Sequence, residues 1–204
     1  MSTTDSAIAR IRAAIRPLTD VPIELCQPAI QFADLIPENL RPAAVLVPIV
    51  MRANLLSLLL TRRTEGLRQH AGQISFPGGA IDLDDGDAIN AALRETWEET
   101  GIEPSFVQPI GYLDRLDTIS AFSITPVVAV VTEGFVIRPE PGEVAEVFEV
   151  PLDYILHPGR MQSVPIEWRG QMRQVDEFYF DSRRVWGATA TILRNLIDRL
   201  EASQ

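Results

Sequence analysis

Three glutamates, Glu95, Glu98 and Glu99, stand close together in a stretch whose composition favours a helix. Residues three and four positions apart share a helix face, so these carboxylates would lie side by side and repel one another. Gly101 follows as a typical helix stop, which places the charges near the carboxyl-terminal end, where the helix dipole also disfavours them. A divalent cation would remove both penalties. The simpler alternative is an acidic helix face in solvent.

Helical spacing predicts which side of this helix is buried. The predicted buried stripe consists of Ile89, Leu93, Thr96, Trp97 and Thr100. Ala88 and Ala91 fall on the acidic side, where small residues would leave room for a metal. Asp85 or Asp87 is the expected N-cap. Hard cations such as Mg²⁺ choose carboxylate oxygens and complete their shell with water and phosphate, so a phosphorylated ligand is expected.

The stretch from Phe76 to Ile102 resembles the signature of the Nudix hydrolases. That signature is a glycine, five residues, Glu, seven residues, Arg-Glu, an apolar residue, any residue, Glu-Glu, any residue, Gly and an apolar residue. The part from Arg94 onward fits, except that Thr96 stands at the apolar position. The part from Gly79 fits if the loop is one residue longer and Asp85 replaces the glutamate.

The resemblance implies an α/β Nudix fold, an α/β/α sandwich with a mixed β-sheet, and hydrolysis of a pyrophosphate bond with Mg²⁺ or Mn²⁺. It implies that Glu95, Glu98 and Glu99 bind the metal, with the carbonyl oxygen of Gly79 as a further ligand. A small-molecule nucleotide is then the expected partner.

Two further roles follow from the same resemblance. Arg94 is expected to hold the acidic loop in place through Asp85, and an ordinary helix ion pair is its alternative role. A general base must reach the attacking water. Glu98, Glu143 and Glu146 are the candidates, and surface charge is the alternative for the last two.

A second motif resembles the coenzyme A pyrophosphatase branch of the family. It runs Leu59-Leu60-Thr61-Arg62-Arg63-Thr64, then Arg68, Gly72 and Phe76-Pro77-Gly78-Gly79, and only Thr64 departs from the pattern. The residues expected to bind substrate are Arg62, Arg63, Arg68, Gly78 and Gly79. Arginine suits bidentate phosphate recognition. The alternative for Arg63 and Arg68 is pairing with neighbouring carboxylates to order the loop.

This motif implies coenzyme A or acyl-coenzyme A as substrate, cut to 3′,5′-ADP and 4′-phosphopantetheine. Nucleoside triphosphates, ADP-ribose and nucleotide sugars are the rival substrates. A hypothesis from another class is a module that senses a nucleotide without cleaving it. Such modules commonly lose the carboxylates of the signature, and the retention of Glu95, Glu98 and Glu99 favours an enzyme.

Bulk properties narrow the partners. The 204 residues are 46% hydrophobic, enough for one core, and the net charge of −10 argues against nucleic acid, which needs a basic surface. Cys26 is the sole cysteine, which excludes an intrachain disulfide and favours a reducing compartment. The sequence has no run of eighteen apolar residues and no signal core at its start, so we expect a cytoplasmic protein without a membrane partner. A homodimer is a possible assembly.

The pattern along the chain predicts two parts, residues 1–42 as a helix and proline-rich arm packed on the domain, and residues 43–204 as the Nudix domain. The amino-terminal helix is expected to end before Pro17. Further expected elements are strands at 43–51 and 55–61 joined as a hairpin, strands at 106–113, 121–131 and 144–150, a helical turn at 152–156, a second hairpin at 162–168 and 174–180, and a last helix at 185–200.

Overall fold

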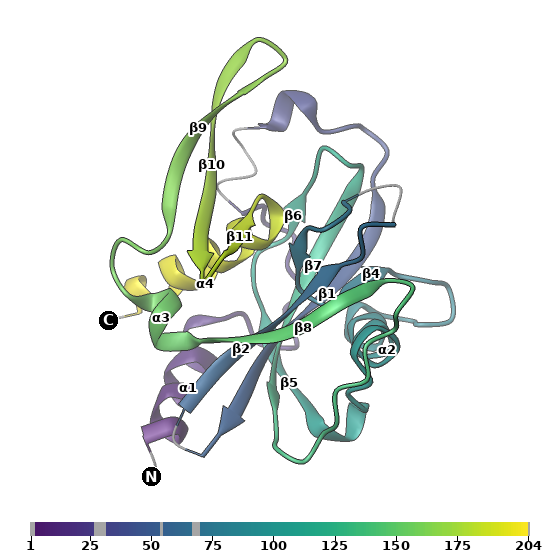
Figure 1. Cartoon of the computed structure of the whole chain (residues 1–204), viewed down its shortest axis with the longest axis vertical. Helices are drawn as coiled ribbons and strands as arrows, with labels where there is room; N and C mark the ends of the chain where they lie inside the picture. Colours follow the sequence, from purple (N-terminus) through teal and green to yellow (C-terminus); the bar gives the residue numbers. More distant parts are fainter. Residues whose placement is uncertain (1–2, 27–31, 54, 67–69, 204) are drawn as a thin grey trace.

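The computed structural model describes residues 3–26, 32–53, 55–66 and 70–203 (Figure 1). The helices are α1 (Thr3–Ala14), α2 (Ala88–Thr100), α3 (Leu152–Leu156), α4 (Ala188–Ala202) and the 3₁₀ helix η2 (Pro104–Phe106). The strands are β1 (Arg41–Arg52), β2 (Leu55–Arg63), β3 (Ile74–Ser75), β4 (Gly78–Ala80), β5 (Val107–Tyr112), β6 (Leu116–Asp117), β7 (Phe122–Val131), β8 (Val144–Pro151), β9 (Gln162–Trp168), β10 (Gln171–Phe180) and β11 (Arg183–Trp186).

The large sheet is mixed, as predicted. Its strand order is β3-β2-β1-β7-β5, with β4 also paired to β1, β6 to β7 and β8 to β2. β1 runs parallel to β7 over ten residue pairs, from Arg41 with Phe122 to Val50 with Val131, and antiparallel to β2 and β4. The predicted hairpin of residues 43–51 and 55–61 is therefore confirmed, and it forms the centre of the sheet.

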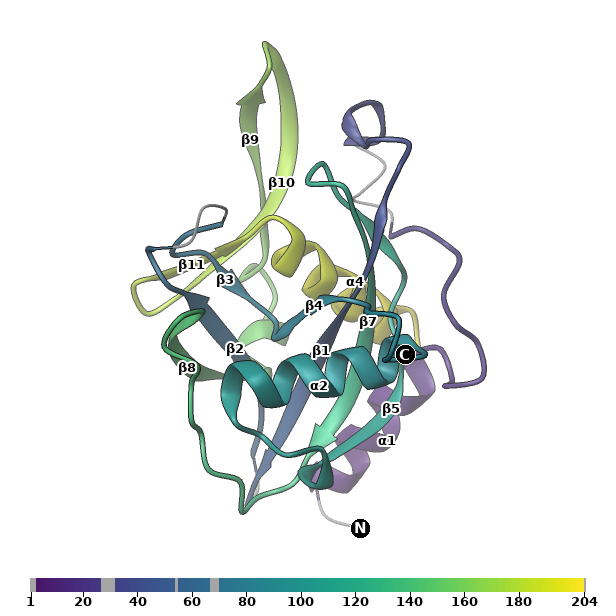
Figure 2. The same cartoon turned by 90° about the vertical axis from the view of Figure 1, so that its right-hand side faces the viewer.

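Helices cover both faces of this sheet, which confirms the sandwich. In Figure 1, α2 lies to the right of the sheet and α1, α3 and α4 lie to its left, and Figure 2 shows α2 crossing in front of the strands. β1 is buried on both sides because its side chains alternate: Leu46 and Val50 pack towards α2, whereas Val47 and Ile49 pack towards α1 and α4. This explains why the strand is apolar throughout instead of alternating with polar residues.

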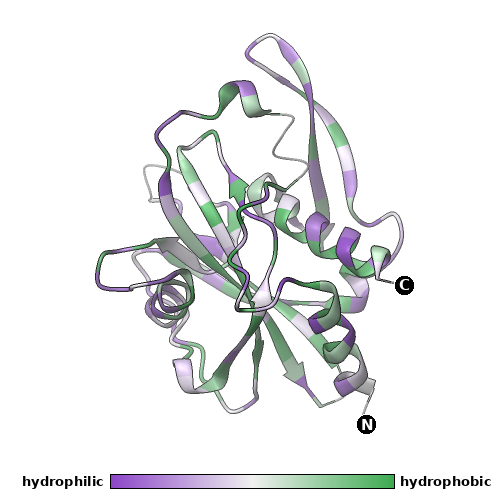
Figure 3. Ribbon diagram, turned by 180° about the vertical axis from the view of Figure 1, so that it is seen from behind, coloured by the Kyte–Doolittle hydropathy of each residue, from purple (hydrophilic) through white to green (hydrophobic). Residues whose placement is uncertain are grey.

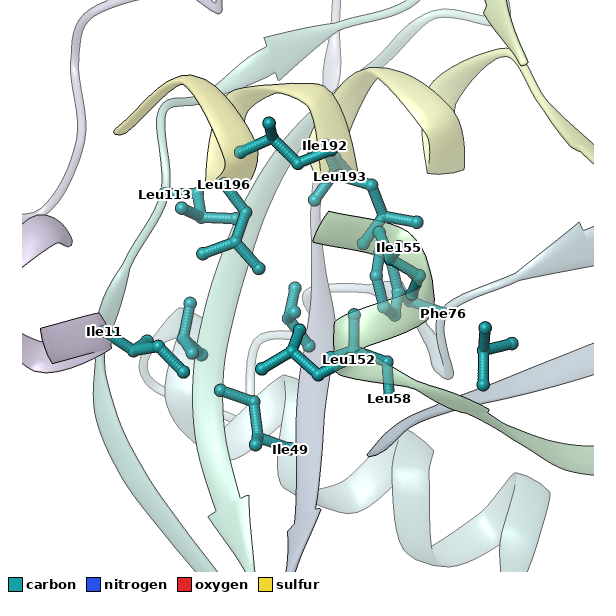
Figure 4. Close-up of a cluster of buried hydrophobic side chains, with 14 of the residues drawn as sticks. Ile11, Ile49, Leu58, Phe76, Leu113, Leu152, Ile155, Ile192, Leu193 and Leu196 are labelled. Atoms are coloured by element: carbon teal, nitrogen blue, oxygen red, sulfur yellow. The ribbon is translucent and has the colours of Figure 1, made fainter. Parts of the chain in front are cut away.

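The larger hydrophobic cluster lies between the sheet, α1, α3 and α4 (Figure 4). Ile11 of α1, Ile155 of α3 and Leu193 of α4 meet side chains of the strands there. Phe76, in the loop between β3 and β4, is buried in the same cluster. The loop that leads into Gly78 is thus fixed from the face opposite α2.

The amino-terminal segment contacts the rest of the chain over its described length. Ile15 and Cys26 lie in the larger cluster, and Arg16 exchanges backbone hydrogen bonds with Tyr112 at 2.9 Å in both directions. The Arg16 side chain also pairs with Asp114 at 3.0 Å, and Asp114 in turn accepts hydrogen bonds from α4. Residues 32–35 form a short 3₁₀ turn within the proline-rich arm.

Beyond the large sheet, β9, β10 and β11 form a three-stranded antiparallel sheet. The hairpin of β9 and β10 projects from the body in Figures 1 and 2. In Figure 3, hydrophobic green concentrates in the strands of the large sheet, whereas the projecting hairpin mixes both colours. Its second strand begins at Gln171, three residues before the predicted start at Gln174. Among the described helices, none is long and apolar enough to cross a membrane.

The helix limits of α2 agree with the sequence, and its predicted buried face is confirmed except at Trp97. Thr96 and Thr100 are buried, and Ile89 and Leu93 pack against the smaller hydrophobic cluster. Asp87 is the N-cap, and Gly101 ends the helix in the left-handed conformation at φ 77°. The buried residues are Ala91, Ala92, Thr96, Glu99 and Thr100, whereas the side chain of Trp97 is 53% exposed. The prediction put every glutamate on the outer side. In the fold, the side that carries Glu99 faces the sheet, so Trp97 on the opposite side faces solvent.

Two further differences concern the start of the last helix and the shortest strands. The last helix begins at Ala188 and not at Val185, because Val185 and Trp186 pair with β10 as part of β11. The short strands β3, β4 and β6 were not predicted, since two or three residues carry too little period to register. Residues 107–112, 122–131, 144–151 and 152–156 confirm the other predicted elements to within two residues.

The cap of α2 gives a stability test. Asp87 accepts a hydrogen bond from the backbone N–H of Asn90 at 2.8 Å. Asp87→Ala should therefore lower the free energy of unfolding by about 1 kcal/mol. Urea denaturation measures this, and Asp84→Ala, in the same exposed loop, should change it by less than about 0.5 kcal/mol. Equal effects of the two substitutions would contradict a specific cap.

Candidate active site

The carboxyl-terminal half of α2 lies against β4, which brings Glu95 to the glycine turn. A Cβ atom at Gly79 would lie only 2.5 to 2.7 Å from the carboxylate atoms of Glu95. A Cβ atom at Gly78, whose φ is +152°, would lie 2.4 Å from the carbonyl oxygen of Ala44 in β1. The two glycines therefore permit two different close approaches, one to the helix carboxylate and one to the neighbouring strand.

Glu99 is an ionisable group buried under the sheet, with 3% of its surface exposed. It accepts a hydrogen bond from the backbone N–H of Gly78 at 3.3 Å, and its Oε1 lies 3.5 Å from Nη1 of Arg63. Burial raises its pKa to about 8, while Arg63 and the Gly78 hydrogen bond lower it and the charges of Glu95 and Glu143 raise it further. The two partners thus offset only part of the cost of burying a carboxylate.

Arg94 joins the helix to the acidic loop. Its guanidinium donates two hydrogen bonds to Asp85, at 2.8 and 2.9 Å, and one to the carbonyl oxygen of Ala80 at 3.2 Å. It also donates to Glu95 at 2.8 Å and to Glu98 at 3.0 Å. The hydrogen bonds from Arg94 hold the pKa of Asp85 well below its usual range. The structure thus brings Arg94 and Asp85 together, with the longer loop folded around the guanidinium.

The oxygen donors at this place suit a hard divalent cation such as Mg²⁺ or Mn²⁺. They are the carboxylates of Glu95, Glu98 and Glu99, and the missing side chain of Gly79 leaves its backbone in contact with Glu95. Across the described residues, no three acidic, histidine or cysteine side chains converge as a metal cluster. One reason is the ion pair between Arg94 and Glu98, which keeps the Glu98 carboxylate next to the guanidinium. The Glu98 side chain is 56% exposed.

The segment before β8 lies over the end of α2. The backbone N–H groups of Arg138 and Glu140 donate to the carbonyl oxygens of Thr100 and Glu99, at 2.7 and 3.1 Å. Burial is the main reason for the raised pKa of Glu95 and Glu99, and the charge of nearby Glu143 adds to it. The charge of Glu143 thus acts on the helix carboxylates from the segment that covers the end of α2.

Glu146 is placed differently. It pairs with Arg62 at 3.1 Å and also with Arg183 of β11, and these arginines lower its pKa. A carboxylate held by two guanidinium groups is a poor proton acceptor. Arg183, which also stacks 4.6 Å above the ring of Phe148, was missed in the sequence because no recognisable motif surrounds it.

The structure separates the arginines of the second motif. Arg62 contacts Glu146, whereas Arg63 contacts Glu99 of the signature helix. Pairing of Arg63 with a carboxylate was the alternative given for it, and the partner is a predicted metal ligand. Arg68 lies outside the described residues.

Comparison with known proteins settles the family. The model of the NUDIX domain matches residues 40–168. The chain belongs to the Nudix family. It is similar to the uncharacterized Nudix hydrolase NudL of Escherichia coli K12, at 46% identity over 158 residues, covering 78% of this chain and 82% of that protein. NudL of Shigella flexneri is 46% identical over 160 residues, covering 78% and 83%.

A solved structure supports the Nudix fold independently. The MutT protein from Methanosarcina mazei Go1 superposes with a TM-score of 0.50 at 18% identity, covering 81% of this chain and 96% of that one. At this identity the likeness concerns the fold alone. Nudix hydrolases generally use divalent ions such as Mg²⁺ or Mn²⁺ and act on nucleotide derivatives, which agrees with the oxygen donors of this site.

The two glycines of the Nudix turn should respond differently to substitution. Gly79→Ala places a methyl group against the Glu95 carboxylate, so we expect a large loss of activity with a loss of unfolding free energy below about 1 kcal/mol. Gly78→Ala meets the backbone of β1 at a positive φ and should cost roughly 2 kcal/mol or more. Thermal denaturation with an activity assay separates the two, and equal destabilisation would contradict this assignment.

The buried carboxylate of Glu99 predicts a pH dependence of stability for the metal-free protein. Its pKa of about 8 exceeds the ordinary value of 4.5 that applies in the unfolded chain, so the folded state binds more protons between these values. The contribution of Glu99 to stability is therefore full below pH 4.5 and falls by about 1.4 kcal/mol per pH unit as the pH rises towards 8.

Denaturation in EDTA across this pH range, with wild type and Glu99→Gln compared, isolates the effect. The variant should gain stability relative to wild type as the pH rises. Parallel curves for the two proteins would show that Glu99 is ionised throughout the range.

Proposed function

We propose that this Nudix protein hydrolyses the pyrophosphate bond of coenzyme A or acyl-coenzyme A, giving 3′,5′-ADP and a 4′-phosphopantetheine product. The observation that supports this most strongly is the meeting of two motifs in one site. Arg63, from the motif that resembles the coenzyme A branch, lies 3.5 Å from Glu99 of the Nudix helix. Substrate recognition by the first motif and cleavage at the second would therefore act on the same phosphates.

Glu95, Glu98 and Glu99 would hold Mg²⁺ or Mn²⁺, with the carbonyl oxygen of Gly79 as a further ligand. The bound cation supplies positive charge that stabilises the charge building on the phosphate oxygens when water attacks. Burial keeps Glu99 in a place of low polarity, where its interaction with a cation is stronger than in water. Arg94 orients Glu95 and Glu98 and holds the loop through Asp85, which makes it a positioning residue.

The attacking water needs a proton acceptor. Glu98 and Glu143 remain the candidates, because the charge of Glu143 acts on Glu99 and the side chain of Glu98 is partly exposed to solvent. Glu146 is disfavoured because Arg62 and Arg183 hold its carboxylate. Arg62, Arg63 and Arg68, with Gly78 and Gly79, are the residues that we propose to bind the nucleotide half of the substrate.

We also propose that residues 1–42 are a helix and arm packed on a catalytic domain of residues 43–204. The apolar contacts of Ile11, Ile15 and Cys26 with the larger cluster support this division. A cytoplasmic location agrees with the single cysteine, which a reducing compartment would keep as a thiol.

Product analysis tests the proposed substrate. Purified protein with Mg²⁺ and coenzyme A should yield 3′,5′-ADP and 4′-phosphopantetheine by chromatography. Glu99→Gln should lower kcat by roughly a hundredfold or more. Glu103→Gln makes the same chemical change at an exposed position just after the helix and should leave turnover at the wild-type rate.

A parallel panel of ADP-ribose, nucleotide sugars and nucleoside triphosphates separates the rival substrates. Intact coenzyme A alongside cleavage of another compound would contradict the coenzyme A assignment. If the whole panel stays intact and calorimetry shows tight ligand binding, the protein is a sensor.

A further inference from the structure

Arg63 lies at the end of β2, where it faces the buried side of α2. Its side chain is 25% exposed, and that of its partner Glu99 is 4% exposed. Arg62 pairs with Glu146 of β8 and Arg63 with Val144, so the register shifts there. Successive side chains of a strand point to opposite faces of the sheet, as Leu58 and Leu59 of β2 do. The two neighbouring arginines accordingly serve different partners, Arg62 on β8 and Arg63 on α2.

The two arginines near Glu99 have different acidic partners. Arg94, the other guanidinium of the site, is engaged by Asp85, Glu95 and Glu98. Among the described contacts of the Glu99 carboxylate, Arg63 is the sole cation, and the N–H of Gly78 is the sole hydrogen-bond donor. A carboxylate removed from water needs a compensating positive charge. Arg63 provides it in the protein as it stands.

The 3.5 Å separation between Arg63 Nη1 and Glu99 Oε1 is an ion pair and not a close, bidentate fork. Both groups thus keep capacity for stronger partners. For Glu99 a stronger partner is a divalent cation, which carries twice the charge. For the guanidinium it is a phosphate group, whose oxygens match the two parallel N–H donors of arginine.

We propose that Arg63 is an internal counter-ion that competes with the catalytic cation for Glu99 and is released to the substrate once the cation has bound. Two positive charges beside one carboxylate repel each other, so cation binding weakens the hold of Glu99 on Arg63. The guanidinium then turns to the phosphates of the incoming diphosphate. This second step rests on the proposed function, whereas the competition for Glu99 does not.

The proposal couples cation and substrate binding through one side chain. The cation frees Arg63 to bind the substrate, and the substrate draws Arg63 away from Glu99, which the cation needs. Linkage requires that each ligand raise the affinity for the other by the same factor. Because Glu99 retains Arg63 until the cation arrives, substrate binding to the cation-free protein is weak. Arg63 is a positioning residue before the cation binds and a phosphate-binding residue afterwards.

Titration with Mn²⁺ in the absence of any nucleotide tests the competition directly, by electron paramagnetic resonance of the free ion. Arg63→Gln should bind Mn²⁺ more tightly than wild type, on the order of tenfold, because a competing positive charge is gone. Arg62→Gln removes the same charge one residue away, where the partner is Glu146, and should shift the affinity by less than about threefold.

The other outcomes overturn the proposal. Unchanged affinity in Arg63→Gln would mean that Arg63 does not compete, and weaker binding would mean that it holds Glu99 ready for the cation. Arg63→Lys keeps the charge and remains informative if the glutamine variant fails to fold. Its Mn²⁺ affinity should stay within about twofold of wild type, and tenfold tighter binding by it would refute a competition of charges.

Thermal stability gives a second readout without substrate. In EDTA, Arg63→Gln should melt below wild type because Glu99 loses its counter-ion, and saturating Mg²⁺ should narrow the gap. A gap that Mg²⁺ leaves unchanged would contradict the exchange. Since neither experiment contains coenzyme A, failure of the proposed substrate would leave both results interpretable.

Discussion

The site depends on a single unfavourable placement, the carboxylate of Glu99 beneath the sheet with one arginine and one backbone N–H as its partners. A buried charge must be compensated or it destabilises the fold. The glycine turn, the end of β2 and the carboxyl-terminal half of α2 meet at this carboxylate. Their packing is therefore an electrostatic arrangement as much as a hydrophobic one, and its charge balance is the part that a cation can change.

The scaffold around this carboxylate is rigid where the chemistry requires it. Gly78 lies against the backbone of β1, Phe76 anchors the preceding loop in the opposite cluster, and Arg94 fixes the following loop through Asp85. The turn is thus held from three directions. β1 is the central strand, with partners on both sides, so the glycine turn packs against the most buried part of the sheet and is fixed by it. In the proposed function, ligands held in this way would cost little reorganisation when the cation and substrate arrive.

Sequence patterns gave the type of most elements, since long apolar runs such as 122–131 and the cap residues of α2 carry strong local signals. They placed Thr96 and Thr100 of α2 correctly but not Trp97 and Glu99. A helical wheel ranks faces by polarity, and it turned Trp97 inward and Glu99 outward. The fold does the reverse at these two positions, where Glu99 is buried and Trp97 is exposed. The error thus arose at a carboxylate of the proposed metal site, where local preference and function are expected to disagree.

Contacts between distant segments were also beyond the sequence. The motif at residues 59–79 and the helix at residues 88–100 each predicted phosphate chemistry, but nothing in either stretch pairs Arg63 with Glu99. Likewise, Arg183 comes from β11, beyond residues 40–168 that match the family, and reaches Glu146 through pairing in a separate sheet. Such pairs depend on strand register and on how α2 packs against the sheet, which a single sequence does not encode locally. The division of labour between the two neighbouring arginines is therefore a property of the folded sheet. It is also why Arg62 and Arg63, alike in charge and adjacent in sequence, can differ in what they do for the cation.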